Sequence, residues 1–235
     1  MAPKKPGAAQ TESAAGMIVP DEDDVHVIPA LTHGRILVRT ARAGAARGLL
    51  VGCHGYKENA RVQMARLRSI PGAAAWTLVS VQALHRFYLG RTDEVVASWM
   101  TREDREAAIA DNLAYVDAAL DAVPHDDSTR IVYTGFSQGV AMAFRAALQG
   151  RRRAAGVIAV GGDVPPELLS DRALRFPPLV LARARRDDWF TQAKFDADVA
   201  ALTARSVSVR PFVYEGGHEW NEAVSSAAGE FLAAL

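Results

Sequence analysis

The sequence predicts a single α/β domain in which a mostly parallel central sheet carries helices on both faces. Short, almost continuously apolar runs alternate along the chain with segments whose apolar residues recur at helical spacing. No internal repeat or long linker divides them. With 235 residues, 49% of them hydrophobic, the chain is long enough to bury a full core. We expect the domain to span residues 21–235.

Strands are predicted where the chain is apolar almost throughout, because parallel strands covered by helices face the interior on both sides. Five such runs are predicted as central strands, at 48–51, 76–81, 130–134, 156–160 and 179–182. Two further runs are predicted as outer strands: 36–38 and 207–213, the latter partly alternating and interrupted by Pro211.

Helices are predicted where apolar residues recur at steps of three and four. The first helix covers about 102–123, and the second follows Ser137 directly. The third contains Phe195, Val199 and Leu202. The fourth, at the C-terminus, contains Val224, Ala228, Phe231 and Leu235. Helices that alternate with buried strands form a doubly wound sheet, whose ligands bind beyond the carboxyl ends of the strands. Functional residues are therefore expected in the loops that follow the apolar runs.

Residues 1–20 are expected to form a flexible tail. They are small and polar and include Pro3, Pro6 and Pro20, so they cannot bury enough apolar surface to offset the entropy cost of ordering. An early pair of lysines is not followed by the apolar segment of a secretory signal, and no window approaches the roughly 20 apolar residues of a membrane span. We expect a soluble, cytoplasmic protein.

Charge and cysteine content exclude several functional classes. The 27 Lys and Arg residues balance the 27 Asp and Glu residues, so no global field draws the chain to nucleic acid. The single cysteine, Cys53, can form neither an intramolecular disulfide nor a Cys-rich zinc cluster, and is interpreted as a small buried residue. The arginine-rich stretches at 151–153 and 183–186 are interpreted as solvated surface.

The strongest functional signal is Gly-Phe-Ser-Gln-Gly at 135–139, between a predicted strand and a predicted helix. It fits the pattern G-x-S-x-G in the strand, turn and helix context of a nucleophile elbow. The turn holds the serine in a strained backbone conformation, and a Cβ at either flanking glycine would collide with the neighbouring strand or helix. Ser137 is therefore the candidate nucleophile.

A serine hydroxyl needs a base, and the base needs a carboxylate that orients it. His218 lies in a glycine turn between the last predicted strand and the last helix, where this architecture places its base. Asp187 follows an earlier strand and completes the order Ser, Asp, His. Asp188 competes with it, Asp163 is a third possibility, and either member of the adjacent pair could instead cap a helix.

Acyl transfer also generates an oxyanion, which backbone N–H groups commonly stabilise. One donor is expected to be the N–H of Gln138, the residue after the candidate nucleophile. The sequence His54-Gly55-Tyr56 follows the first central strand and predicts the Tyr56 N–H as the second donor. His54 is expected to support this loop through hydrogen bonds.

An apolar acyl pocket is the hypothesis for specificity. A long connection between a strand and a helix contains Phe87, Tyr88 and Trp99, and such connections often line or cover a pocket. Trp189 and Trp220 flank the candidate acid and base. Packing residues would give the same pattern.

Together these residues resemble the phospholipase/carboxylesterase family of α/β-hydrolases, which includes acyl-protein thioesterases and small bacterial carboxylesterases. The resemblance implies the α/β-hydrolase fold and hydrolysis of carboxylic esters or thioesters without a cofactor. Family members usually have a second glycine where this chain has Lys57, and related dienelactone hydrolases carry cysteine where it has a serine. The likeness runs from about residue 35 to the end of the chain, and the matching residues are 135–139 for the elbow, Gly217-His218-Glu219 for the histidine turn, Asp187 for the acid and His54-Gly55 for the oxyanion loop.

We therefore expect a serine hydrolase that acts on small-molecule esters. Ser137 would attack the carbonyl, His218 would take and return the proton, and Asp187 would orient His218. A thioesterase or an acyl-peptide hydrolase is an alternative because the same triad serves all three leaving groups. A non-catalytic binding protein on this fold is the alternative of another class. No metal is expected, since the residues after His218 do not make H-E-x-x-H. The sequence does not predict the oligomeric state.

Overall fold

The computed structural model describes residues 24–42 and 46–235. The chain divides into a short N-terminal unit, Met1–Ala30, and a larger unit, Leu31–Leu235. The described residues of the first unit are exposed and belong to no helix or strand. The predicted tail over residues 1–20 lies outside the described residues. Every helix and strand described below belongs to the larger unit.

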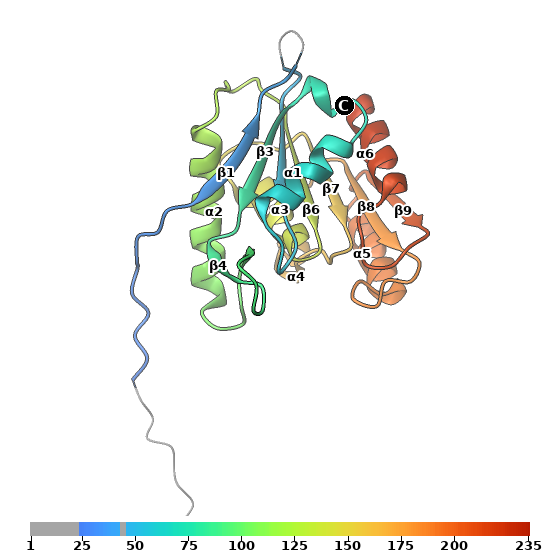
Figure 1. The fold of residues 1–235 in the computed structure, drawn as a ribbon. Coiled ribbons are helices and arrows are strands. Elements are labelled where there is room, and N and C mark those ends of the chain that lie inside the picture. The colour runs from blue at the N-terminus through green and yellow to red at the C-terminus, as the bar shows by residue number, and fades with distance from the viewer. Residues whose placement is uncertain (1–23, 43–45) are drawn as a thin grey trace, which may run out of the picture. The chain divides into compact units, whose positions relative to one another are not determined.

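All seven predicted apolar runs are strands of one sheet (Figure 1). Their bounds, in spatial order across the sheet, are β1 (Arg35–Arg39), β3 (Thr77–Gln82), β2 (Leu49–Cys53), β6 (Ile131–Phe136), β7 (Gly156–Val160), β8 (Leu179–Ala184) and β9 (Val209–Tyr214). β1 runs antiparallel to β3, and the other neighbouring pairs are parallel. β1 and β9 form the two edges, as predicted for the outer strands.

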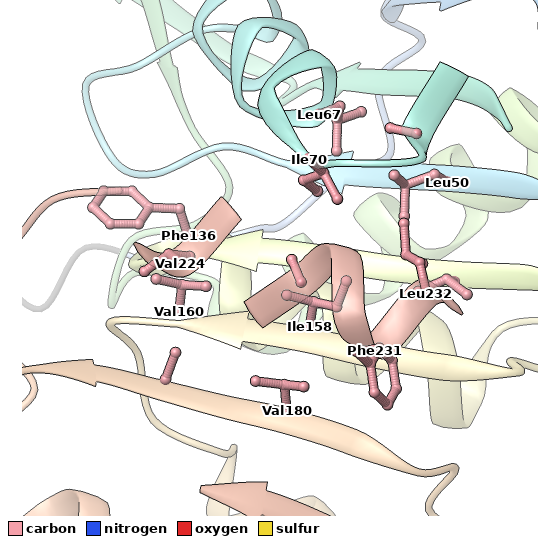
Figure 2. Packing of buried hydrophobic residues seen from close by; sticks show 14 of the residues in the cluster. Leu50, Leu67, Ile70, Phe136, Ile158, Val160, Val180, Val224, Phe231 and Leu232 are labelled. Atoms are coloured by element: carbon pink, nitrogen blue, oxygen red, sulfur yellow. The ribbon is translucent and has the colours of Figure 1, made fainter. Parts of the chain in front are cut away.

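Helices cover both faces of this sheet. α1 (Ala60–Ser69) and α6 (Glu222–Ala234) pack on one face, where their apolar residues join those of the strands in one cluster (Figure 2). α2 (Arg105–Asp121), α3 (Gln138–Gln149) and α5 (Gln192–Ala204) pack on the other face. Among the described helices, none combines the length and the apolar character needed to cross a membrane.

Successive residues of a central strand serve opposite faces, because side chains alternate along a strand. In β2, Leu50 joins the cluster that contains Leu67 of α1 and Leu232 of α6 (Figure 2). Its neighbour Val51 joins the cluster that contains Leu120 of α2. Both faces of the sheet are covered, which is why the predicted runs are apolar throughout.

Several elements differ from the prediction. The long connection that contains Phe87 and Tyr88 forms an unpredicted two-stranded antiparallel sheet, β4 (His85–Tyr88) and β5 (Val95–Ser98), whose first strand is mostly exposed. α1 escapes the sequence analysis because its buried face includes Gln63, so its apolar stripe is weak. Two short helices are also unpredicted: the 3-10 helix at Ala73–Ala75 and α4 at Pro166–Ser170.

Candidate active site

Loops at the carboxyl ends of four parallel strands carry the candidate residues. Tyr56 follows β2, Ser137 follows β6, Asp187 follows β8 and His218 follows β9. The carboxyl ends of parallel strands lie at the same edge of a sheet, so residues far apart in the sequence can meet there. The strand order explains how residues spread over 163 positions, from 56 to 218, contribute to one site.

The turn at Ser137 has the strained geometry expected of an elbow. Its φ and ψ are 53° and −121°, a conformation that residues other than glycine rarely adopt. A Cβ on Gly135 would lie 2.4 Å from the carbonyl oxygen of Gly139, and a Cβ on Gly139 would lie 2.2 Å from the carbonyl oxygen of Cys53. Only glycine fits at both positions, and α3 can therefore pack directly against the loop after β2.

Ser137, His218 and Asp187 form a continuous hydrogen-bonded chain. The Oγ of Ser137 lies 2.8 Å from Nε2 of His218, and Nδ1 of His218 lies 2.8 Å from Oδ2 of Asp187. A carboxylate can only accept, so Nδ1 carries the proton and Nε2 is free to accept the serine proton. Asp187 is buried, and its Oδ1 accepts hydrogen bonds from the backbone N–H groups of Trp189 and Phe190, at 2.9 Å each.

The two competing acids do not contact His218 in the described part of the chain. Asp188 is exposed, although it is adjacent to Asp187. Asp163 forms an ion pair with Lys194, with 3.0 Å between Oδ2 and Nζ. Of the three candidates, only Asp187 contacts His218 in the described part of the chain.

The two predicted oxyanion donors are free to bind a substrate. Neither the N–H of Tyr56 nor that of Gln138 donates to an acceptor among the described residues. His54 is fully buried; its Nδ1 donates to the carbonyl of Gly55 (2.7 Å) and its Nε2 accepts from the N–H of Ala83 (3.0 Å). Burial lowers the pKa of His54, which keeps it neutral. These contacts agree with a supporting role in the loop.

Lys57 adopts the backbone conformation that a glycine would adopt easily. Its φ is 60°, in the left-handed region. Its N–H donates to the carbonyl of Ala97 of β5 (3.2 Å), and the next residue donates to the carbonyl of Gly55 (3.2 Å). A lysine therefore occupies a turn position that favours glycine, at the cost of local strain.

A cleft of about 320 Å³ opens beside the serine. It is lined by Ser137, Gln138, Ala141, the loop from Gly161 to Pro166, Trp189, and three cations, Arg105, Arg145 and Lys194. Of the five predicted pocket residues, only Trp189 lines this cleft. The sequence does not single out these three cations, because they come from separate elements and no local motif groups them.

The structure does not bring the other four aromatic residues to the cleft. Trp99 is fully buried, and its indole N–H donates to the carbonyl of His54 (2.8 Å). Trp220 packs against the core cluster beneath α6. On the β4 strand, Phe87 lies against the Tyr56 ring, with 5.9 Å between centroids, and Tyr88 is 64% exposed. The two tryptophans do not line the cleft because they pack in the protein interior, and Tyr88 does not line it because its side chain is exposed to solvent.

Glu58, Arg66 and Phe136 form a network that contacts both the His54–Gly55 loop and His218. The Glu58 carboxylate accepts a hydrogen bond from the N–H of Gly55 (2.7 Å) and two from Arg66 (2.5 and 2.6 Å). The Arg66 guanidinium lies 4.1 Å from the centroid of the Phe136 ring, which packs on His218 at 5.0 Å. This network connects the candidate oxyanion loop to the candidate base. In the sequence, its only visible sign is Glu58, which follows His54-Gly55 closely.

Neither metal chemistry nor a reactive thiol is indicated at this site. Within the described residues, no group of His, Cys, Asp and Glu is arranged to hold a metal ion. Burial raises the pKa of the Cys53 thiol to about 12, so Cys53 stays protonated at neutral pH.

Comparisons with known proteins agree with this architecture. Residues 93–182 match the family described as Phospholipase/Carboxylesterase. The fold is similar to that of esterase PE8 (23% identity, TM-score 0.66, covering 86% of this chain and 99% of that chain). It is also similar to acyl-protein thioesterase 2 of Zea mays (19%, 0.67, 86% and 99%) and to the Bacillus cereus carboxylesterase (14%, 0.65, 86% and 94%). No curated protein is significantly similar in sequence.

These findings confirm the predicted resemblance and the α/β-hydrolase fold. The matched family consists of hydrolases, so the prediction of a hydrolase enzyme is confirmed at the level of its class. The matched segment contains Ser137 and its flanking glycines but ends before Asp187 and His218. The roles of the individual residues therefore rest on the geometry described above.

Proposed function

We propose that this α/β-hydrolase, similar to the phospholipase/carboxylesterase family, is a serine hydrolase that cleaves carboxylic esters through an acyl-enzyme intermediate. The observation that carries the proposal is the chain of two 2.8 Å contacts from Ser137 Oγ through His218 to Asp187. The match of residues 93–182 to a family of hydrolases supports it independently. The esterase and the thioesterase among the similar structures have the same overall fold.

Acylation begins with the serine. Ser137 Oγ attacks the ester carbonyl carbon while His218 Nε2 takes its proton. The imidazolium that forms is stabilised by the carboxylate of Asp187, whose other oxygen accepts two backbone hydrogen bonds. The N–H groups of Gln138 and Tyr56 stabilise the oxyanion. His218 then gives its proton to the leaving alkoxide as the C–O bond breaks.

Deacylation repeats these steps with water. His218 takes a proton from the water that attacks the acyl carbon, and the proton returns to Ser137 Oγ as the acyl C–O bond breaks. The products are an alcohol and a carboxylic acid. The rigid elbow contributes because the nucleophile needs no rearrangement before attack.

A thioesterase or an acyl-peptide hydrolase would use the same residues, because the triad acts on the acyl carbon whatever the leaving group. The geometry of the triad is complete, which favours an enzyme over a non-catalytic binding protein on this fold. A panel of esters, thioesters and acyl-peptides that share one acyl group separates the three activities.

The decisive experiment is intact-protein mass spectrometry after exposure to a fluorophosphonate. Wild type should gain one adduct, whereas Ser137→Ala and His218→Ala should gain none. His85→Ala is the matched control, since His85 is exposed on β4, and it should label like wild type. A folded wild-type protein that gains no adduct would contradict the proposal and favour the binding protein.

A further inference from the structure

The cleft beside Ser137 contains more positive than negative charge. Its three cations are Arg105, Arg145 and Lys194. Arg145 pairs with Glu167, and Lys194 pairs with Asp163. The side chain of Arg105 has no ion-pair or hydrogen-bond partner among the described residues. Three cations against two carboxylates leave one positive charge uncompensated.

Arg145 is the buried member of the three cations. Its side chain is only 1% exposed, and it holds Oε1 of Glu167 through Nε (3.0 Å) and a terminal nitrogen (2.5 Å). Burial lowers the pKa of Arg145, Glu167 opposes that shift, and the nearby charge of Arg105 adds to it. Both side chains line the cleft, and Arg105, unlike Arg145, is exposed. Arg145 therefore acts through a lower effective dielectric than the exposed Arg105 and Lys194 do.

The positions of these residues define where a substrate lies. Ser137, Ala141 and Arg145 are spaced four residues apart, so they share the face of α3 that borders the cleft. Arg145 is about 12 Å from Ser137 along the helix axis, at 1.5 Å per residue. Ala141 has a small side chain between them. An elongated substrate bound at the serine therefore extends towards the guanidinium groups.

We propose that the substrate carries a carboxylate or phosphate on the part of the ester that lies along α3, and that Arg105 binds this anionic group. The substrate class rests on the proposed esterase function, whereas the charge preference rests on the cleft. A guanidinium without a partner presents planar N–H donors that match a carboxylate or phosphate. The acidic neighbours of Arg105 in the sequence, Glu103, Asp104 and Glu106, do not line the cleft.

The test compares anionic with neutral esters of equal length. The p-nitrophenyl hemi-esters of adipic and suberic acid carry the anion on the acyl group, and the hexanoate and octanoate esters are their neutral partners. Butyrate esters of 4-hydroxybenzoate and 4-cresol test an anion on the leaving group. We expect wild type to favour the anionic member of one pair by about tenfold in kcat/KM, since a charge-assisted hydrogen bond discriminates at this level.

Arg105→Gln should remove this preference while the neutral esters change by less than about twofold. Arg102→Gln is the matched control, because it removes the same charge three positions away and Arg102 does not line the cleft. Arg105→Lys should retain part of the preference. Equal activity on anionic and neutral esters in wild type, or equal effects of the two glutamine variants, would overturn the proposal.

A binding measurement separates this proposal from the esterase proposal. Calorimetry on Ser137→Ala with monoethyl adipate needs no turnover, and the added Arg105→Gln substitution should weaken binding by about tenfold. If Arg105→Gln weakens binding of monoethyl adipate but wild type is not labelled by the fluorophosphonate, the anion site is supported and the esterase proposal is contradicted. If wild type is labelled and hydrolyses neutral esters but Arg105→Gln does not change the binding of monoethyl adipate, the esterase proposal is supported and the anion site is contradicted.

Discussion

Asp187 is distinguished from its neighbour by the turn that follows β8. Two backbone N–H groups donate to its Oδ1, which leaves Oδ2 for His218. Asp188 is exposed and, among the described residues, contacts neither these two N–H groups nor His218. Adjacent carboxylates with the same local sequence context therefore differ completely in burial. At the scale of the residue, hydrogen bonds to the backbone decide which of the two carboxylates faces His218.

Asp187→Asn should lower kcat by a factor on the order of 10³–10⁴, because a neutral amide neither stabilises the imidazolium nor holds the reactive tautomer. Asp188→Asn should change kcat by less than about twofold, as expected for a surface substitution. Steady-state hydrolysis of a neutral p-nitrophenyl ester measures both, with circular dichroism as the check on folding. Equal losses in the two variants would remove Asp187 from the triad.

Asp198 of α5 is a buried carboxyl close to the cleft. Burial raises its pKa to about 6, and Asp163 adds to the rise, whereas the N–H of Val164 (2.9 Å from Oδ2) and the charge of Lys194 oppose it. The unfolded carboxyl titrates near pH ~4. Between these values the folded protein keeps a proton that the unfolded chain has lost. The stability contribution is therefore fully present below about pH 4 and is lost as the pH rises to about 6.

Asp198→Asn should remove this dependence, since an amide oxygen can still accept from Val164 but does not titrate. The free energy of unfolding of wild type, relative to the variant, should fall by about 1–2 kcal/mol between pH 4 and pH 7. Urea denaturation at several pH values measures it. Asp196→Asn, an exposed change on the same helix, is the control and should show no such trend. A difference independent of pH would contradict the raised pKa.

At the scale of the element, α1 fixes the oxyanion loop. The helix begins directly after the loop, and its N-cap Asn59 accepts hydrogen bonds from the N–H groups of Arg61 and Val62. Arg66, in the second turn, pairs with Glu58, which in turn holds the N–H of Gly55. The helix thus couples the loop to the Phe136 ring behind His218.

Arg66→Met should lower kcat by about 10–100-fold with little change in KM, because it loosens both the oxyanion loop and the packing on His218 while the cleft stays intact. Arg68→Met is the control, since Arg68 is exposed on the same helix, and it should behave like wild type. The pH dependence of kcat, measured beside the melting temperature, separates a positioning role from lost stability, because only a displaced base changes the profile. An unchanged profile with only a lower melting temperature would make Arg66 purely structural.

The β4–β5 hairpin is tied to the elbow by one side chain. The Oε1 of Gln138 accepts from the N–H of Trp99 (3.0 Å), and its Nε2 donates to the carbonyl of Met100 (2.9 Å). Because this connection is long and contains aromatic residues, it is predicted to line or cover a pocket. Its strands escape prediction because β4 is mostly exposed and has no apolar alternation. Its observed contacts are with the oxyanion loop and the elbow.

At the scale of the whole Leu31–Leu235 unit, the sheet separates two packing layers. Ile158 of β7 belongs to the cluster beneath α1 and α6 (Figure 2). Ile131 of β6 belongs to the cluster beneath α2 and α3. Each layer is closely packed. Because the sheet lies between them, a cavity in one layer should leave the side chains of the other undisturbed.

Ile158→Val and Ile131→Val should each lower the free energy of unfolding by about 0.5–1.5 kcal/mol. The double variant should lose the sum of the two values within about 0.5 kcal/mol, because the sites share no packing partners. Urea denaturation of the four proteins measures the cycle. A larger interaction energy would indicate that the two layers rearrange together.

The sequence by itself determined the elements and the elbow. Apolar runs, helical spacing and the glycines at 135–139 are local patterns, and each follows from the conformation of a few neighbouring residues. They were sufficient to predict the seven strands of the sheet, four of its helices, and Ser137, His218 and Asp187 as candidates, with Asp188 and Asp163 as alternative acids.

Only the tertiary structure decided which distant groups meet. The choice of Asp187 over Asp163, the burial of Trp99 and the gathering of Arg105 and Arg145 beside Ser137 depend on strand order and on turns between elements. The physical reason is that burial and charge proximity are properties of the packed chain. Residues 40 positions apart can share a cleft, while adjacent carboxylates can face the interior and the solvent.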